Sequence, residues 1–183
     1  MVTTRPSTVA DLERMTSDEA ERYELYAGVL REVEAMGGRH GEIGFELIGP
    51  LYLYLRTNPI GRVYTEATHF IILRDPDVVL MPDVAFVRAD RLPPVEEREG
   101  FMPLAPDLAV EVLSPSNRAR EMAEKVELYQ RGEVRLVWVV QPRRRAVTVY
   151  PLGGDPRTLH ETDSLEGGEV LPGFRLPVAD LFR

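Results

Sequence analysis

The sequence lacks cysteine, has a single lysine and contains no long apolar run. The absence of cysteine among 183 residues excludes disulfides, thiol chemistry and zinc sites with cysteine ligands. No apolar run approaches the roughly 18 residues that a membrane-spanning helix requires. The first residues, Met1-Val-Thr-Thr-Arg, lack the apolar segment of a signal peptide. These absences suit a cytoplasmic protein with no membrane partner.

The length and the net charge of the chain limit the number of domains and the kinds of partner that we expect. A chain of 183 residues fits one domain, and we expect that domain to span residues 1–183. The net charge of −8 argues mildly against tight non-specific binding of nucleic acid, but it leaves room for a local basic site. The 15 prolines and the strong preference for arginine over lysine are typical of a thermophile or of a GC-rich genome.

The histidines are few and scattered. His40, His69 and His160 lie far apart in the sequence, which argues against a metal site built from histidines. We expect each of them to be structural or at the surface. His40 is the one to examine, because it stands beside the start of a long predicted helix.

The stretch from Asp107 to Tyr129 is the most informative part of the chain. Residues 108–113 form an apolar run with one acid, Glu111, in its middle, which predicts a strand covered on both faces. An ionised carboxylate in such a strand is costly unless a cation or several donors meet it. Ser114 or Ser116 can then cap a helix that carries Lys125.

Lys125 has two interpretations. Glu121 precedes it by four residues, so the two side chains can form an ordinary surface pair on the helix. Alternatively, Lys125 lies three residues after Met122 and four before Tyr129, at the edge of the apolar stripe, so its ammonium can point toward the sheet. Only lysine combines a compact charge with a pKa that shifts readily, so its single use here is notable.

Periodicity predicts the order of the remaining elements. We expect an N-terminal helix at 7–15, a β-hairpin over 22–34 and a long amphipathic helix over 39–56; strands at 62–66, 69–73, 84–87 and 107–113; a helix at about 117–131; strands at 135–140 and 146–150; and short strands to the end. This order predicts an α/β (α+β) fold, with a central mixed β-sheet flanked by helices.

Among the acids, Asp83 is the best partner for Glu111. Asp77 lies in a turn-like segment, and Asp107 precedes Glu111 by four residues on the same strand, roughly 13 Å away. Asp83 instead opens a different apolar strand, so neighbouring strands can bring the two carboxylates together. The plainer interpretation is that Asp83 only begins a strand after Pro82, as aspartate often does.

Taken together, these segments resemble the PD-(D/E)XK, or restriction-endonuclease-like, nuclease superfamily. The chain is most similar to a bacterial branch of presumptive endonucleases long labelled a domain of unknown function. The similar segments are YELYAGVLREVEA, His40 at the start of the helix, MPDVA around Asp83, APDLAVEVLSPSNR, and EKVELYQRGEVRLVWVVQP. The resemblance therefore covers most of the chain and implies a restriction-endonuclease-like core.

The resemblance also implies roles for particular residues. Asp83 matches the aspartate of the superfamily motif, and Glu111 matches its second acid. The lysine that the motif places two residues later is absent, because Leu113 stands there; some branches carry it on the following helix, where Lys125 lies. A further glutamate early in the long helix would be Glu42 or Glu46, with His40 as another possible accessory residue. The branch often has an acid where this chain has Gln141.

The implied activity is metal-dependent hydrolysis of phosphodiester bonds in nucleic acid, with DNA the expected substrate. Asp83, Glu111 and the carbonyl of Val112 would hold Mg²⁺ (or Mn²⁺), and Lys125 would act on the water or the phosphate. A homodimer is expected, because two sites cut two strands. The basic residues expected to contact nucleic acid are Arg118, Arg120, Arg143, Arg144 and Arg145.

Two alternatives remain open. The chain can be an inactive member of the same fold that binds nucleic acid or a protein, an interpretation that the acidic net charge favours. It can also be a metal-dependent hydrolase of a small phosphodiester. Metal-dependent activity on such a compound, with none on DNA, would distinguish the last case.

Overall fold

The computed structural model describes residues 5–33, 37–114 and 119–183. Its helices are α1 (Val9–Glu13), α2 (Ser17–Ala20), α3 (Gly38–Thr57) and α4 (Ala119–Arg131), with short 3-10 turns η1 (Ala89–Arg91), η2 (Val95–Arg98), η3 (Pro142–Arg144) and η4 (Val178–Phe182). No helix in these ranges is both long enough and apolar enough to cross a membrane.

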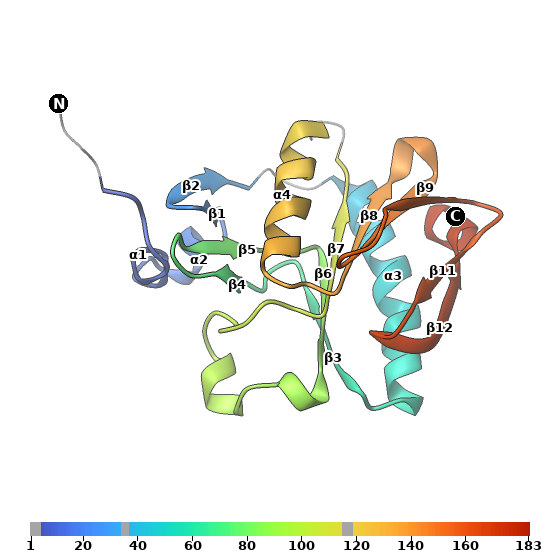
Figure 1. Cartoon of the computed structure of the whole chain (residues 1–183), viewed down its shortest axis with the longest axis horizontal. Helices are drawn as coiled ribbons and strands as arrows, with labels where there is room; N and C mark the ends of the chain where they lie inside the picture. Colours follow the sequence, from blue (N-terminus) through green and yellow to red (C-terminus); the bar gives the residue numbers. More distant parts are fainter. Residues whose placement is uncertain (1–4, 34–36, 115–118) are drawn as a thin grey trace.

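A six-stranded mixed sheet forms the centre, in the order β10-β9-β8-β7-β6-β3. Its strands are β3 (Gly61–Thr65), β6 (Val84–Arg88), β7 (Leu108–Val112), β8 (Leu136–Gln141), β9 (Ala146–Pro151) and β10 (Arg157–His160). β7 and β8 run parallel, joined through α4, and every other neighbouring pair in this sheet is antiparallel. The predicted central mixed sheet with flanking helices is confirmed (Figure 1).

Alternation along β7 and β8 supplies both faces of this sheet with apolar side chains. On one face, Val110 and Trp138 pack with residues of α3 such as Leu47. On the other face, Ala109 and Val137 pack with residues of α4. Every residue of β7 is buried, Glu111 included, which confirms the prediction of a strand covered on both faces.

The helix α3 follows the 3.6-residue period closely. Ile43, Leu47 and Leu51 recur every four residues and are fully buried against the sheet. Pro50 lies inside the helix and donates no backbone hydrogen bond, yet the helix continues to Thr57. The predicted boundaries of 39–56 are thus confirmed to within one residue at each end.

A second, four-stranded sheet lies beside α4, in the order β2-β1-β5-β4. It contains β1 (Tyr23–Tyr26), β2 (Val29–Glu32), β4 (Phe70–Leu73) and β5 (Val78–Leu80). The predicted hairpin of β1 and β2 is present, and it turns through Ala27 and Gly28, both with positive φ, as a two-residue hairpin turn requires.

This second sheet was not predicted as a separate unit. The run at 69–73 was expected as a strand, and β4 confirms it, but it pairs with β5 rather than joining the central sheet. β5 was not predicted, because three apolar residues are too few to show a period. The C-terminal short strands are β11 (Ser164–Gly167) and β12 (Leu171–Pro177), which pair only with each other.

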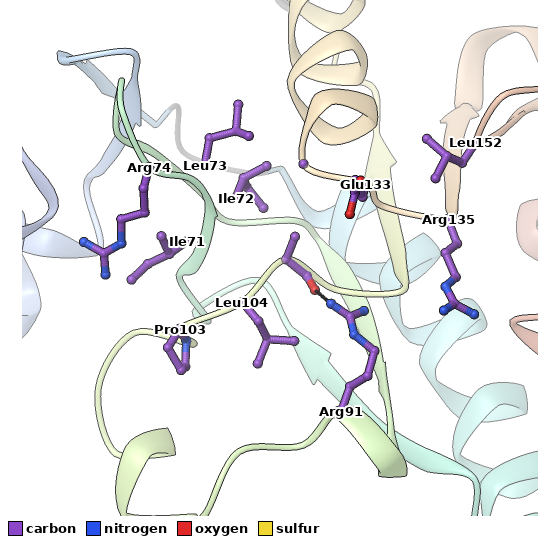
Figure 2. A pocket seen from close by; sticks show the side chains of 12 residues that line it. Ile71, Ile72, Leu73, Arg74, Arg91, Pro103, Leu104, Glu133, Arg135 and Leu152 are labelled. Carbon is purple, nitrogen blue, oxygen red and sulfur yellow. Dashed lines mark hydrogen bonds between the residues drawn. The ribbon is translucent and has the colours of Figure 1, made fainter.

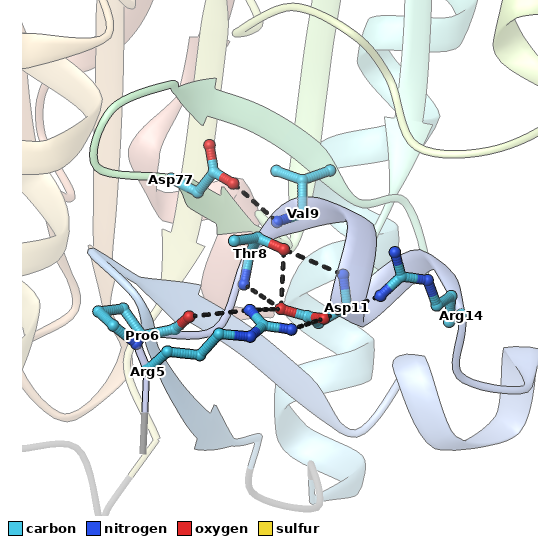
Figure 3. A network of polar contacts seen from close by, with 7 residues as sticks. All are labelled: Arg5, Pro6, Thr8, Val9, Asp11, Arg14 and Asp77. Carbon is cyan, nitrogen blue, oxygen red and sulfur yellow. Dashed lines mark hydrogen bonds and ion pairs between the residues drawn. The ribbon is translucent and has the colours of Figure 1, made fainter. Parts of the chain in front are cut away.

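Polar contacts fix the N-terminal segment to this second sheet (Figure 3). Thr8 caps α1 by accepting from the backbone N–H of Asp11, whose carboxylate accepts in return from the N–H of Thr8. Arg5 forms two hydrogen bonds of 2.7 Å with the same carboxylate. Asp77, expected in a turn, accepts from the backbone N–H of Val9 at 2.8 Å and so ties α1 to the segment between β4 and β5.

Gly61 is the position where the sheet leaves no room for a side chain. A Cβ there would lie 2.2 Å from the carbonyl oxygen of Val87 and 2.5 Å from the ring of Phe86. We expect Gly61→Ala to lower the free energy of unfolding by about 1–3 kcal/mol, because backbone and a buried ring must both shift. Gly44→Ala is the control: its Cβ meets nothing within 4 Å, and alanine favours the helix by up to about 1 kcal/mol. Urea unfolding measures both, and equal stability of Gly61→Ala and the parent would contradict the packing.

Candidate active site

Asp83 and Glu111 face each other at one end of the central sheet. Val84 on β6 pairs with Val110 on β7 in antiparallel register, which places Asp83, one residue before, opposite Glu111, one residue after. Opposed positions of this kind have Cβ atoms about 5 Å apart and side chains on the same face. The strand pairing therefore brings together the two acids that the sequence analysis selected.

Glu111 is deeply buried, and both of its oxygens have partners. The phenol of Tyr129 donates to Oε1 at 2.6 Å, and the ammonium of Lys125 lies 2.9 Å from Oε2. Both donors come from α4, which covers this face of β7. The cation that a carboxylate in an apolar strand requires is thus Lys125.

Lys125 also binds a second acid, Glu24 of β1. Its Nζ lies 2.9 Å from Oε1 of Glu24, which also accepts from the backbone N–H of Met81 at 2.7 Å. The other oxygen of Glu24 accepts from the phenol of Tyr26 at 2.8 Å. The surface pair of Lys125 with Glu121 is therefore not the main contact of this lysine, whose ammonium points toward the sheets.

Glu24 and Tyr129 were not among the predicted site residues, although the strand YELY places Glu24 between apolar neighbours much as β7 places Glu111. Burial of Glu24 is the signal that could have found it, and burial depends on the second sheet. Glu24, Asp83, Glu111 and Lys125 are hereafter called the carboxylate–lysine cluster.

Asp83 is held by the strand next to it and approached by α3. The backbone N–H of Val112 donates to Oδ2 at 2.5 Å. Nε2 of His40 lies 2.9 Å from Oδ1, but neither ring nitrogen is aligned for a hydrogen bond with a described group. His40 and Asp83 both have side chains that are 12% exposed. The first turn of α3 thus adds an imidazole to the edge of the cluster.

The electrostatics of the cluster follow from its burial. Burial is the largest cause that raises the pKa of Glu111, and the net value is about 8: Lys125 lowers this pKa, and the carboxylates of Asp83 and Glu24 raise it. Burial alone would lower the pKa of Lys125, but the carboxylates of Glu111 and Glu24 raise that pKa well above its ordinary value. Burial also raises the pKa of Tyr129. Lys125 is therefore cationic at neutral pH, whereas ionised Glu111 is costly.

The other accessory candidates lie apart from the cluster. Glu42 is exposed and pairs with Arg39 at 3.0 Å. Glu46 is half-buried one turn further along α3 and has no hydrogen bond or ion pair with another described residue. The structure therefore brings His40 to Asp83, and neither of the two glutamates.

The predicted nucleic-acid-binding arginines divide into three groups. Arg118 lies outside the described residues. Arg120, Arg143 and Arg144 are exposed, the first in the opening turn of α4 and the others in η3. Arg145 already has partners within the chain: its guanidinium donates hydrogen bonds to the carboxylate of Glu161 at 2.5 Å and to the carbonyl of Phe182 at 2.9 Å.

A pocket of about 520 Å³ lies elsewhere (Figure 2). Ile71, Leu104 and Glu133 line it together with Arg91 and others. Arg91 forms a 2.9 Å ion pair with the buried Asp107, which precedes β7. Because Asp107 and Glu111 are four residues apart on an extended strand, the pocket lies at the end of β7 opposite to the carboxylate–lysine cluster.

Comparison with known proteins agrees with this architecture. Residues 9–179 match the Uma2 family, which is described as "Putative restriction endonuclease". The chain belongs to the Uma2 family. A crystal structure described as a "putative nuclease belonging to DUF820" from Anabaena variabilis is 19% identical, with a TM-score of 0.85, and the match covers 97% of this chain and 98% of that one. Proteins with curated descriptions gave no match.

The donors of this Uma2 chain fit a Mg²⁺ ion held by few protein ligands. The described residues contain no cluster of three or more His, Asp or Glu side chains that could hold a metal. Mg²⁺, however, is usually held by one or two carboxylates together with waters and substrate phosphates. Asp83 and Glu111 offer two, and because burial raises the pKa of Glu111 even with Lys125 beside it, a further cation would relieve the cost of ionising this carboxyl.

The charge balance of the cluster predicts a pH-dependent loss of stability in Lys125→Met. The pKa of Glu111 is raised in the folded chain, so its burial costs nothing below the unfolded value near 4.5 and an increasing amount as the pH rises toward about 8. Removal of its cation should therefore cost about 3–5 kcal/mol at pH 8 and clearly less at pH 5, where Glu111 is protonated. Urea unfolding at the two pH values measures the difference.

Arg175→Met is the matched control for this experiment. Arg175 pairs with Glu166 at 2.8 Å, but both side chains are exposed, at 68% and 46%. Such a surface pair contributes roughly 0–1 kcal/mol. We expect a small loss that is similar at pH 5 and pH 8. If Lys125→Met behaved in the same way, the ammonium would not be what compensates the buried acids.

Proposed function

We propose that this Uma2 protein is a metal-dependent endonuclease that hydrolyses phosphodiester bonds of DNA. The observation that carries the proposal is the placement of Asp83 opposite Glu111 on neighbouring strands, with the only lysine of the chain 2.9 Å from Glu111. The membership of the Uma2 family supports a nuclease, although the lysine stands on α4 rather than two residues after the second acid.

The cation would be Mg²⁺ or Mn²⁺, held by Asp83, Glu111 and the backbone carbonyl of Val112. When bound, such an ion supplies a Lewis acid that lowers the pKa of water and neutralises charge on a phosphate. The chain prepares both carboxylates: the N–H of Val112 fixes Asp83, and the phenol of Tyr129 fixes Glu111. Fixed donors cost little reorganisation when the substrate arrives.

Lys125 would stabilise the negative charge that develops on the scissile phosphate. Its ammonium is held at the cluster by Glu24 as well as by Glu111, so it keeps one carboxylate partner when Glu111 turns toward a cation. Glu24 is therefore a positioning residue in this proposal. A cation prepositioned in a site with little water acts more strongly than one in bulk solvent.

DNA would approach the edge of the sheet where the cluster lies. The turn η3 follows β8, and β8 runs parallel to β7, so η3 stands at the same edge as Glu111. The N–H of Leu113 donates to the carbonyl of Val140 at 2.9 Å, which keeps the two strand ends together. Arg143 and Arg144 on η3 thus provide positive charge near the cluster despite the net charge of −8.

A plasmid-nicking assay in Mg²⁺ and in Mn²⁺ tests the catalytic roles. Asp83→Asn and Glu111→Gln should lose both cleavage and the binding of Mn²⁺ measured by calorimetry, with unchanged or improved stability because the acids are crowded. Lys125→Arg should keep Mn²⁺ binding and lose most cleavage, because the flat guanidinium cannot occupy the place of the ammonium.

Glu127→Gln is the control for these variants. Glu127 is exposed on the same helix as Lys125 and is not a member of the carboxylate–lysine cluster, so cleavage should stay at the parental rate. An active parent whose Lys125→Arg variant cuts equally fast would show that the lysine is wrongly assigned. A parent with no cleavage of DNA, but with metal-dependent hydrolysis of bis(p-nitrophenyl) phosphate, would favour a hydrolase of small phosphodiesters.

The salt dependence of DNA binding tests the basic surface. Each phosphate contact that is lost should reduce the slope of log affinity against log salt by about one unit. Arg120→Gln should lower the slope by about one, and the double variant Arg143→Gln/Arg144→Gln by about two. Arg157→Gln is the control, because Arg157 is exposed on β10, the outer strand of the sheet. Equal slopes for all four proteins would make these arginines an ordinary solvated surface.

One observation favours an inactive, binding-only member of the family. Both oxygens of Glu111 are already occupied, by Tyr129 and by Lys125, so the cluster is complete as a structural ion network. In that case Mn²⁺ would not bind, and DNA would bind without being cut. The calorimetric arm of the nicking experiment separates this interpretation from the proposed nuclease.

A further inference from the structure

The pocket at the far end of β7 lies between three segments that are distant in the sequence (Figure 2). Residues 71–74 belong to β4 and the turn after it, residues 103–105 to the loop before β7, and residues 132, 133 and 135 to the connection between α4 and β8. Its volume of about 520 Å³ lies within the range of roughly 300–1,000 Å³ that is typical of small-molecule sites. The pocket is therefore large enough for a small organic ligand.

Two guanidiniums converge beside this pocket. Nη1 of Arg91 lies 2.9 Å from Oδ1 of Asp107, and Nε of Arg135 lies 3.6 Å from the same oxygen. The separation of these two nitrogens is therefore at most the sum of the two distances. Asp107 is fully buried, and its Oδ2 accepts a hydrogen bond from the backbone N–H of Arg88 at 2.9 Å, which fixes the carboxylate. One carboxylate thus serves two cations, and one positive charge is left over.

The arginines that line the pocket keep hydrogen-bond donors for a ligand. A guanidinium carries five N–H donors. Arg91 gives one to the carbonyl of Ala105 at 3.0 Å, and Oδ1 of Asp107 accepts no aligned hydrogen bond from a described residue. Arg74, the third arginine of the lining, is exposed and has no ion pair or hydrogen bond with another described residue. An acidic group in the pocket can therefore receive hydrogen bonds that these side chains do not use within the described chain.

Apolar side chains form much of the remaining lining. Ile72 and Leu104 pack with the core between the central sheet and α4, and both also line the pocket. Leu152 lines it as well and is 44% exposed. Covering exposed leucine with an apolar part of a ligand is favourable. A ligand that suits both kinds of surface has an acidic group and an apolar body.

Glu133 lines the same pocket in a backbone conformation that a side chain seldom adopts. Its φ is +59°, just after the end of α4, where glycine is the usual residue. The glycine of this helix end is instead Gly132, where a Cβ would lie 2.4 Å from Cγ2 of Ile72 and 2.9 Å from its carbonyl oxygen. The carboxylate of Glu133 has no ion pair or hydrogen bond with another described residue. Strained residues of this kind cluster at ligand sites, and no contact of the described chain accounts for a glutamate here.

We propose that this pocket binds a small organic anion, namely a carboxylate or a phosphate monoester on an apolar body. Arg91 and Arg135 receive the acidic group, because they supply two cations for one protein carboxylate. Leu104 and Leu152 cover the apolar body. The carboxylate of Glu133 opposes further negative charge and so disfavours a polyanion such as DNA.

A plainer role of these residues is to fasten the loop between β6 and β7. The ion pair of Arg91 with Asp107 does this, since Arg91 belongs to η1 of that loop. It does not account for a second arginine beside Asp107, nor for Arg74 and Glu133, which have no side-chain partner among the described residues. Ligand binding here does not require nuclease activity, because the pocket and the carboxylate–lysine cluster lie at opposite ends of β7.

Isothermal titration calorimetry with naphthalene derivatives tests the pocket. 1-Naphthoate and 1-naphthyl phosphate carry the two acidic groups on the same apolar ring system, and at least one of them should bind with a Kd below about 1 mM. 1-Naphthylmethylamine has the same rings with a positive charge, and acetate has the acidic group without the rings, so both should bind at least roughly tenfold more weakly. The tighter of the two naphthyl anions identifies the acidic group. No binding of either anion, or equally tight binding of the amine, would overturn the proposal.

Two substitutions test whether the anion binds in this pocket. Arg135→Gln should weaken binding at least roughly fivefold, because a charge-assisted hydrogen bond is lost. Leu152→Glu should abolish binding, because it places a negative charge against the apolar body. Arg157→Gln and Val29→Glu are the matched controls, since both positions are exposed and lie outside the lining, and they should keep the parental Kd. Circular dichroism checks that each variant is folded. Equal affinity of Arg135→Gln and Arg157→Gln would overturn the assigned site.

Glu133→Gln tests the opposing charge. The substitution keeps the size of the side chain and removes its charge, so the anion should bind at least about twofold more tightly. Glu127→Gln is the control, because Glu127 is exposed on α4 outside the lining, and it should leave the Kd unchanged. Weaker binding of the anion by Glu133→Gln would mean that Glu133 contacts the ligand favourably and would overturn this arrangement of charges.

Discussion

The burial of one ammonium group, that of Lys125, constrains the arrangement of much of this structure. Lys125 comes from α4, and its two carboxylate partners come from β1 of the small sheet and β7 of the central sheet. A buried charge is tolerated only where opposite charges and hydrogen bonds compensate it. These two contacts therefore hold one helix and two sheets together around the cluster. With Asp83 nearby, however, the acids outnumber the ammonium, so the cluster retains a demand for further positive charge or for protons.

The register of the central sheet fixes the positions of the residues in the cluster. Antiparallel pairing of β6 with β7 places Asp83 opposite Glu111, while the parallel connection through α4 returns the chain to β8 with Lys125 and Tyr129 facing β7. Apolar side chains on both faces leave these polar groups little room to move. A site formed on strand ends and supported by a packed helix can hold its groups in fixed positions, as electrostatic stabilisation of a reacting phosphate requires.

The helix α3 serves the molecule with different faces. Its inner face completes the core against the sheet, its first turn brings His40 to Asp83, and its outer face exposes Phe45, Tyr52 and Leu53. These uses do not compete, because the 3.6-residue period separates them around the helix axis. The charged side chains are also unevenly distributed: the net charge is −8, but Arg143 and Arg144 lie at the edge of the sheet that carries the cluster.

Apolar periodicity was sufficient to predict the helices and strands that have a clear period, and the position of Glu111 in an apolar run was sufficient to predict that it needs a cation. The run at 108–113 predicted a strand buried on both faces, and the spacing of Ile43, Leu47 and Leu51 predicted α3. Both predictions succeed because the period of the buried apolar residues is visible within a short segment of the sequence. The sequence left two interpretations of Lys125 open, because a lysine that pairs with Glu121 at the surface and a lysine that contacts the sheet fit the same pattern of residues along the helix. Only the tertiary structure selected Glu24 and Glu111, because β1 is distant in sequence and reaches Lys125 through a second sheet that short strands such as β5 did not reveal.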